Sequence, residues 1–190
     1  MRLILASSSP RRAELLTSAG FVFDVSPADV DETLWEAEEP RAYALRVAQD
    51  KAATAAAKHA DGRVVLAADT VVVAGGEILG KPRDAGDAER MLRRLSDGVH
   101  EVLTAVVVRA SDGETSEVVT TRVHFLRLTD AEMAWYVASG EPDGKAGAYA
   151  IQGRAARFID RIEGSWSNVV GLPIATVYRL LNPDPDRSRT

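Results

Sequence analysis

The sequence predicts a mixed α/β fold in which helices flank a sheet of parallel and antiparallel strands. Strand-like and helix-like patterns alternate through the first half of the chain, as they do where helices connect neighbouring strands. Turn signals at Gly75-Gly76 and Ser111-Asp112-Gly113 each separate two strand-like segments, which indicates hairpins and therefore antiparallel pairs. Hydrophobic residues make up 46% of the 190 residues, enough for an ample core, so we expect one domain over residues 1–181.

The N-terminal half begins with a short apolar strand that runs into a helix. Ser9 is placed as the N-cap of this helix and Pro10 as its first residue, where a missing N–H costs nothing. Gly20 is its stop signal. The expected elements are, in order, a strand at Arg2–Ala6, a helix at Pro10–Ala19, a strand at Phe21–Ser26, an acidic loop at 27–39, a helix from Pro40 to about Ala60 and a strand at Arg63–Val73.

The C-terminal half combines hairpin strands with shorter helices. Thr129 or Asp130 is expected to cap one of these helices. Residues 182–190, with two prolines flanked by aspartates, are expected to form a flexible tail. The other elements are a strand at Glu77–Leu79, a helix from Asp84 or Gly86 to Leu95, strands at His100–Ala110 and Glu117–Leu128, a helix at Asp130–Ser139, a glycine-rich loop at 140–153, a strand at Ala155–Ile162 and a closing helix within Val169–Leu181.

Composition excludes several classes of function. The absence of cysteine removes disulfides, thiolate nucleophiles and zinc–sulfur sites. The formal net charge of −5 disfavours generic binding to a nucleic acid backbone. The N-terminus has no signal-peptide pattern, and no apolar run approaches the roughly 20 residues of a membrane span. We therefore expect a cytoplasmic protein with no nucleic acid or membrane partner.

Residues 5–16, LASSSPRRAELL, are the most informative segment of the chain. The free N–H groups and the positive dipole end of the predicted helix attract anions. Arg11 and Arg12 add charge in a form that suits phosphate oxygens, and the hydroxyls of Ser7 and Ser8 lie just before them. The segment therefore predicts a phosphate site, although it has no P-loop motif. The alternative is an ordinary capped helix with two solvated arginines.

Two carboxylates are candidates for catalysis or for metal binding. Asp69 lies within an otherwise apolar strand, where a charge is costly unless it is paired, metal-bound or at an open strand end. Glu32 lies in the acidic loop, and beside Asp69 it would form an oxygen-rich site for magnesium or manganese. The alternatives are a strand-end aspartate that caps a turn and a solvated acidic loop.

Two lysines are candidates for contacting phosphates. Lys51 shares an apolar helical stripe, so it either extends its charge to solvent or meets a phosphate where the stripe ends at a cleft. Lys81 lies between Gly80 and Pro82, a turn that aims the lysine inward or leaves it exposed. The nearby Arg41 and Arg46 are interpreted as surface charge.

The segment Gly144–Gly153 predicts either a ligand-binding loop or a flexible surface loop. Glycines allow a ligand to approach the backbone closely, and the amide of Gln152 can both donate to and accept from a base edge. The three histidines show no ligand spacing, so we expect structural or surface roles for His59, His100 and His124.

Taken in order, these segments resemble the Maf family of nucleoside triphosphate pyrophosphatases over residues 3 to about 181. The resemblance implies an elongated, twisted mixed sheet with two lobes and a central cleft. The sequence departs from the family pattern at Trp166-Ser167-Asn168, where many relatives have a tyrosine. The matching segments are LASSSPRRAELL (5–16), Asp31-Glu32, Asp50-Lys51-Ala52, AADTVV (67–72), GEILGKPRD (76–84), MLRRLSDGVHEVLTAV (91–106), YVASGEPDGKAGAYAIQG (136–153) and GSWSNVVGLP (164–173).

The resemblance also implies an activity, the hydrolysis of a nucleoside triphosphate to the monophosphate and pyrophosphate with a divalent cation, Mg²⁺ or Mn²⁺. Asp69 matches the proton acceptor, and Glu32, Lys51 and Lys81 match charged residues around the phosphates. Arg11, Thr70 and Gln152 match positions linked to substrate choice, and together they look like the branch that acts on dTTP and UTP rather than on N7-methyl-GTP.

Two other functions remain open at this point. One is a nucleotide-binding regulator of septum formation or cell division, and the other is a pyrophosphatase for modified or purine triphosphates. A homodimer is an expectation that rests on the resemblance alone.

Overall fold

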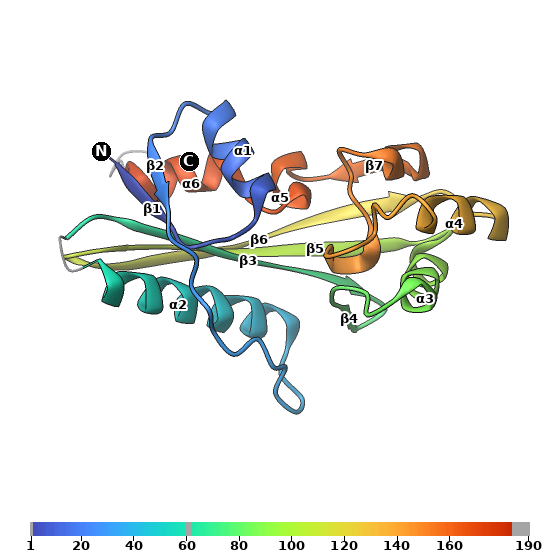
Figure 1. Cartoon of the computed structure of the whole chain (residues 1–190), viewed down its shortest axis with the longest axis horizontal. Coiled ribbons are helices and arrows are strands. Elements are labelled where there is room, and N and C mark those ends of the chain that lie inside the picture. Colours follow the sequence, from blue (N-terminus) through green and yellow to red (C-terminus); the bar gives the residue numbers. More distant parts are fainter. Residues whose placement is uncertain (1, 60–61, 184–190) are drawn as a thin grey trace. The chain divides into compact units, whose positions relative to one another are not determined.

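The computed structural model describes residues 2–59 and 62–183, and the chain divides into two compact units (Figure 1). Unit 1 contains the residues up to Asp69, Thr104–Val119 and the residues from Gly171 onward. Unit 2 contains Thr70–Leu103 and Thr120–Val170. Three of the four borders fall inside long strands, so each of these strands contributes residues to both units, and the fourth border lies between Val170 and Gly171.

Among the described residues, the strands form one seven-stranded mixed sheet in the order β2-β1-β3-β5-β6-β7, with β4 paired to β3. Strand β1 is parallel to both β2 and β3, whereas β4 is antiparallel to β3 and β7 is antiparallel to β6. The predicted mixed α/β fold is therefore confirmed. The strands are β1 (Leu3–Leu5), β2 (Phe23–Val25), β3 (Val65–Ala74), β4 (Glu77–Leu79), β5 (Val99–Ala110), β6 (Gly113–Phe125) and β7 (Ile159–Glu163).

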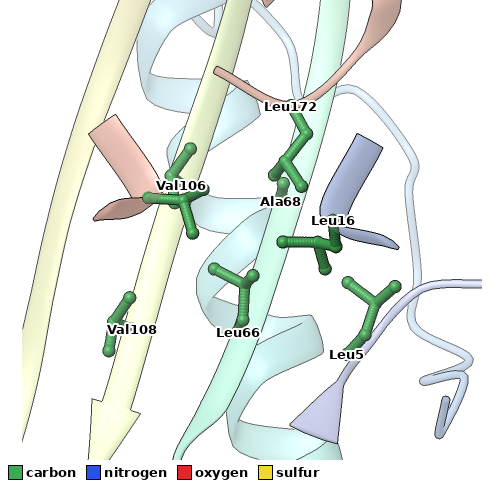
Figure 2. Close-up of a cluster of buried hydrophobic side chains, with 8 residues drawn as sticks. Leu5, Leu16, Leu66, Ala68, Val106, Val108 and Leu172 are labelled. Carbon is green, nitrogen blue, oxygen red and sulfur yellow. The ribbon is translucent and has the colours of Figure 1, made fainter. Parts of the chain in front are cut away.

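In unit 1, helices lie on both faces of the sheet: α1 (Pro10–Ser18) and α6 (Ile174–Leu181) on one, and α2 (Pro40–Lys58) on the other (Figure 1). Figure 2 shows the hydrophobic cluster on the α1 and α6 side, to which β3 contributes Leu66 and Ala68. Because side chains alternate along a strand, Asp69 points to the α2 side. The full cluster is Leu5, Leu16, Leu66, Ala68, Val106, Val108, Leu172 and Val177.

Unit 2 is built around buried aromatic side chains. His100, Phe125 and Tyr149 meet edge to face, with ring centroids 5.0 to 5.3 Å apart. Tyr136 packs in the same way on Phe158. The helices of this unit are α3 (Ala85–Leu95), α4 (Asp130–Val137), α5 (Trp166–Val170) and the 3₁₀ helices η1 (Ala146–Ala148) and η2 (Arg154–Phe158).

Side-chain caps confirm two of the predicted helix starts. Asp84 accepts a hydrogen bond from the N–H of Asp87 at the start of α3. Thr129 and Glu132 form a reciprocal capping box at the start of α4. At α1, Ser9 is the N-cap residue but its side chain makes no capping bond. Ser9 as the N-cap residue and Pro10 as the first helical residue are nevertheless confirmed, and the Ser9 N–H donates to Ser7 Oγ at 3.2 Å.

Two predicted strands differ in the structure, and one short helix is additional. The strand predicted at Ala155–Ile162 is a 3₁₀ helix followed by β7, since alternation alone does not distinguish a short helical turn from a strand. The closing helix predicted within Val169–Leu181 is confirmed as α6, and the unpredicted short helix α5 precedes it, separated from it by Gly171, with a φ of 127°, and Pro173. The second strand of the β5–β6 hairpin begins at Gly113 instead of Glu117.

The long helix, predicted to end at about Ala60, ends at Lys58, and Ala60 itself lies outside the described residues. Residues 184–190, most of the predicted tail, also lie outside them. Across the described ranges, the longest apolar stretches of helix fall short of what a membrane crossing requires.

Candidate active site

Lys51 bridges two carboxylates in unit 1. Its Nζ lies 2.6 Å from Glu32 Oε1 and 2.8 Å from Asp69 Oδ1. Lys51 and Asp69 are each only 8% exposed, whereas the Glu32 side chain is 43% exposed. The interpretation of Lys51 as extending to solvent is therefore wrong, because two acceptors hold its charge inside. Asp69 is the fifth of ten residues in β3, so it is not a strand-end cap.

The same helix that carries Lys51 also fixes the acidic loop that carries Glu32. The hydroxyl of Tyr43 donates to the backbone carbonyl of Glu32 at 2.8 Å. Burial, together with the negative charges of Asp69 and Glu32, raises the pKa of Tyr43 to about 12, so this hydroxyl stays a donor. Helix α2 therefore positions both partners of the Lys51–Glu32 ion pair.

Arg46, one turn beyond Tyr43 on α2, is a second anchor for this loop. Its guanidinium contacts three loop residues: it donates to the Thr33 carbonyl at 3.0 Å and to both Glu38 carboxylate oxygens at 2.7 and 2.8 Å, and it lies 4.0 Å from the Trp35 ring centroid. The prediction that Arg46 is surface charge is therefore wrong. The signal in the sequence was the spacing of Tyr43 and Arg46, which places both on one face of the helix, beside a loop rich in acceptors.

The serine-rich loop and α1 place a buried guanidinium next to Asp69. Arg12 Nε donates to the Gly171 carbonyl at 2.8 Å, and Nη1 donates to the Ala68 carbonyl at 2.7 Å and to Ser7 Oγ at 3.2 Å. Burial lowers the pKa of Arg12, while the negative charge of Asp69 opposes that shift. The solvated-arginine alternative is thus wrong for Arg12.

Replacing Arg12 with lysine should destabilise the protein even though the charge is kept. A lysine has no planar fork to reach two carbonyls at once, so at least one of the carbonyls of Ala68 and Gly171 loses its partner. We expect the free energy of unfolding to fall by about 2–3 kcal/mol in urea titrations. Arg11→Lys is the matched control and should change stability by less than about 0.5 kcal/mol. Equal stability of the two variants would contradict the anchoring role of Arg12.

In unit 2, the turn before Lys81 is joined to the glycine-rich segment. The N–H of Gly147 donates to the Gly80 carbonyl at 3.0 Å. Gly147 has a φ of 69°, and a Cβ there would lie 2.9 Å from Val72, so this position requires glycine. Residues 147–151 are buried, which contradicts the flexible-loop alternative, whereas Lys81 and Gln152 are exposed.

The histidines have the structural and surface roles that the sequence predicts. His100 is buried beside Tyr149, with 2.8 Å between Nε2 and the tyrosine hydroxyl oxygen. Burial, and to a lesser extent His124, lowers the pKa of His100 to about 4, so it is neutral near pH 7. His59 contacts Ser26, and His124 contacts Glu163.

The ten predicted site residues fall into two groups. Unit 1 brings Ser7, Arg12, Glu32, Lys51 and Asp69 into one connected set, because Arg12 bonds the carbonyl of the residue before Asp69. Ser8, which is exposed, and Arg11, which is half-buried, flank this set in sequence. Thr70, Lys81 and Gln152 belong to unit 2. Within the described part of the chain, no three His, Asp or Glu side chains gather in a way that could hold a metal ion.

Comparisons with known proteins identify the family. The profile of a family described as "Maf-like protein" matches residues 2–183. A dTTP/UTP pyrophosphatase of Anaeromyxobacter dehalogenans is 57% identical over 184 residues, which cover 95% of this chain and 92% of the relative. A dTTP/UTP pyrophosphatase of Geotalea uraniireducens is 53% identical over 181 residues, 94% of this chain and 93% of the relative.

A solved structure of a HAM1 protein from Coxiella burnetii has the same fold. It superimposes with a TM-score of 0.55 over 97% of this chain and 100% of that chain, at 14% identity. At this sequence identity the similarity shows a shared fold and carries no conclusion about activity. The profile match and the similarity to the two pyrophosphatases, each over nearly the full length, together show that this chain belongs to the Maf family.

Proposed function

We propose that this chain hydrolyses dTTP and UTP to the corresponding monophosphate and pyrophosphate. The observation that carries the proposal is the buried Lys51, which holds the carboxylates of Asp69 and Glu32 on either side of one ammonium group. Such a charge cluster is costly to bury, and a binding protein has no need of a carboxylate that can accept a proton from water. The names of the two curated relatives support the same substrates.

Asp69 is the general base in this proposal. Cleavage at the α-phosphorus needs a water that loses its proton as it attacks, and a positioned carboxylate typically contributes about 10²–10⁴-fold to such a step. Lys51 fixes one oxygen of Asp69, and β3 fixes its backbone. The carboxylate is therefore held in one orientation before the substrate binds.

The donor set fits a divalent cation that arrives with the triphosphate. Mg²⁺ is commonly bound through one or two carboxylates together with substrate phosphates and waters, and Mn²⁺ accepts the same oxygen ligands. Glu32 and Asp69 supply two carboxylates, so these residues would hold the ion. When bound, the ion would neutralise charge on the phosphates and lower the pKa of a bound water.

The remaining residues bind the triphosphate. Ser7, Ser8 and the first N–H groups of α1 supply donors, and Arg11 and Arg12 supply positive charge, with Arg12 also anchoring the loop through backbone carbonyls. Lys51 and Lys81 add two further cations. Thr70 and Gln152 are assigned to substrate choice.

Gln152 is assigned to reading the base, because its amide can pair with the O and N–H edge of uracil or thymine. Losing one paired polar contact changes discrimination strongly. We expect Gln152→Ala to reduce the ratio of kcat/KM for UTP over CTP by about tenfold or more. Steady-state kinetics on both substrates measures this ratio, and an unchanged ratio would remove Gln152 from base recognition.

A panel of nucleoside triphosphates with Mg²⁺ or Mn²⁺ tests the function itself. Release of pyrophosphate and monophosphate, fastest with dTTP and UTP, supports the proposal. A preference for modified or purine triphosphates would overturn the substrate assignment. Binding without turnover would favour the regulator of septum formation or cell division, and release of orthophosphate would indicate cleavage at the γ-phosphorus.

A further inference from the structure

Glu141, in the turn after α4, uses its carboxylate to bind the backbone of a distant segment. Oε2 accepts the N–H of Arg154 at 3.0 Å, and Oε1 accepts the N–H of Ala155 at 3.3 Å. The hydroxyl of Tyr136 donates to the same Oε1 at 2.9 Å. Burial acts to raise the pKa of Glu141, but these donors outweigh it and the pKa is lowered, so the group is ionised near pH 7.

The network reaches both sides of Gln152. Tyr136, which is fully buried, also accepts the N–H of Ala150 at 3.2 Å on its hydroxyl. The carboxylate of Glu141 thus holds the chain two residues before Gln152 through Tyr136, and two and three residues after it directly. We call these hydrogen bonds, which the Glu141 carboxylate makes directly or through Tyr136, the clamp. Hydrogen bonds to an ionised acceptor are roughly twice as strong as neutral ones, so the clamp should hold this backbone in place.

A side chain at the position between these anchors would have to displace the Glu141 carboxylate. A Cβ built on Gly153 would lie 2.5 Å from each carboxylate oxygen of Glu141. The backbone therefore passes directly against the carboxylate, immediately after Gln152. The Gln152 side chain is exposed, and the backbone fixes the point and the direction of the Cα–Cβ bond from which it projects.

We propose that Glu141 is a positioning residue for base selection: its carboxylate clamps the chain on both sides of Gln152 and so fixes where the amide that reads the base can point. The proposal rests on the function proposed above and adds a residue that does not itself touch the nucleotide. Tyr136 relays the clamp to Ala150.

Kinetics on UTP and CTP with Glu141→Gln and Glu141→Ala test this role. The alanine variant should reduce the kcat/KM ratio of UTP over CTP by about tenfold, because the backbone from which the Gln152 side chain projects is no longer held in place. Glutamine keeps the size and one acceptor oxygen, so its ratio should lie between those of alanine and wild type. Amide hydrogen exchange of Ala150, Arg154 and Ala155 should be faster in both variants.

Glu132→Gln is the matched control, because the Glu132 carboxylate also accepts a backbone N–H in unit 2, that of Thr129 at 2.8 Å. It should lower stability without changing the substrate ratio. The amides of Ala150, Arg154 and Ala155 could exchange faster in Glu141→Gln while the kcat/KM ratio of UTP over CTP stays at the wild-type value. In that case the clamp is structural only and the proposal is overturned. A wild-type enzyme without any preference for UTP would contradict the proposed function instead, and that result needs no variant.

Discussion

Asp69→Asn should abolish nearly all turnover and leave nucleotide binding largely intact. The asparagine keeps the shape and the oxygen that accepts from Lys51, but it cannot take a proton from water. We expect pyrophosphate release to fall by about 10²–10⁴-fold, the contribution of a positioned general base. Pyrophosphate release with saturating UTP and Mg²⁺, together with calorimetric binding of UTP, separates the loss of chemistry from any loss of affinity.

Asp112→Asn is the matched control for this loss. Asp112 lies in the exposed β5–β6 turn of the same unit, so its substitution changes the net charge equally and should leave the rate unchanged. Wild-type turnover in a folded Asp69→Asn protein would remove Asp69 from the mechanism.

Lys51→Met should reduce both activity and stability. Methionine has a similar length, but without the ammonium group the carboxylates of Asp69 and Glu32 face each other uncompensated. Removing one partner of a buried ion pair typically costs about 3–5 kcal/mol, and we expect the lower end because Glu32 is partly exposed. The missing cation should also lower kcat by about 10²–10³-fold. Urea unfolding and pyrophosphate release measure the two effects.

A double variant separates the two consequences of the Lys51 substitution. In Lys51→Met/Asp69→Asn the uncompensated buried charge is gone, so the protein should be more stable than Lys51→Met alone while remaining inactive. If the two substitutions instead destabilise additively, Lys51 and Asp69 do not interact as the geometry indicates.

The sequence predicts most of the elements because their signals are local. The proline at the start of α1, the cap at Asp84 and the Gly75-Gly76 turn each act within a few residues. The assignments that failed depend on partners distant in sequence. The segment after Gly153, predicted as a strand, forms a 3₁₀ helix whose first N–H groups are bonded by the carboxylate of Glu141, more than ten residues earlier.

The candidate site shows the same limit. Asp69 is predictable because a lone carboxylate in an apolar strand is costly and therefore needs an explanation. The burial of Lys51 is not predictable, since an apolar stripe does not indicate which acceptors approach it from another segment. The spacing of Tyr43 and Arg46 indicates a shared helix face, but not which atoms of the acidic loop Arg46 binds. Only the packing of α2 against β3 and the acidic loop brings these partners together.

Because α2 carries Tyr43, Arg46 and Lys51, its length and twist fix the distance between the contacts with the acidic loop and the contact with Asp69 in β3. Each extra residue inserted between Arg46 and Lys51 would turn the lysine by about 100° and advance it by about 1.5 Å. Length changes should therefore be tolerated in the exposed turn at Glu36-Ala37, which none of the anchoring contacts described above involves, and rejected in that stretch of helix. New sequence can be inserted at this turn of the acidic loop without disturbing the charge cluster of Glu32, Lys51 and Asp69.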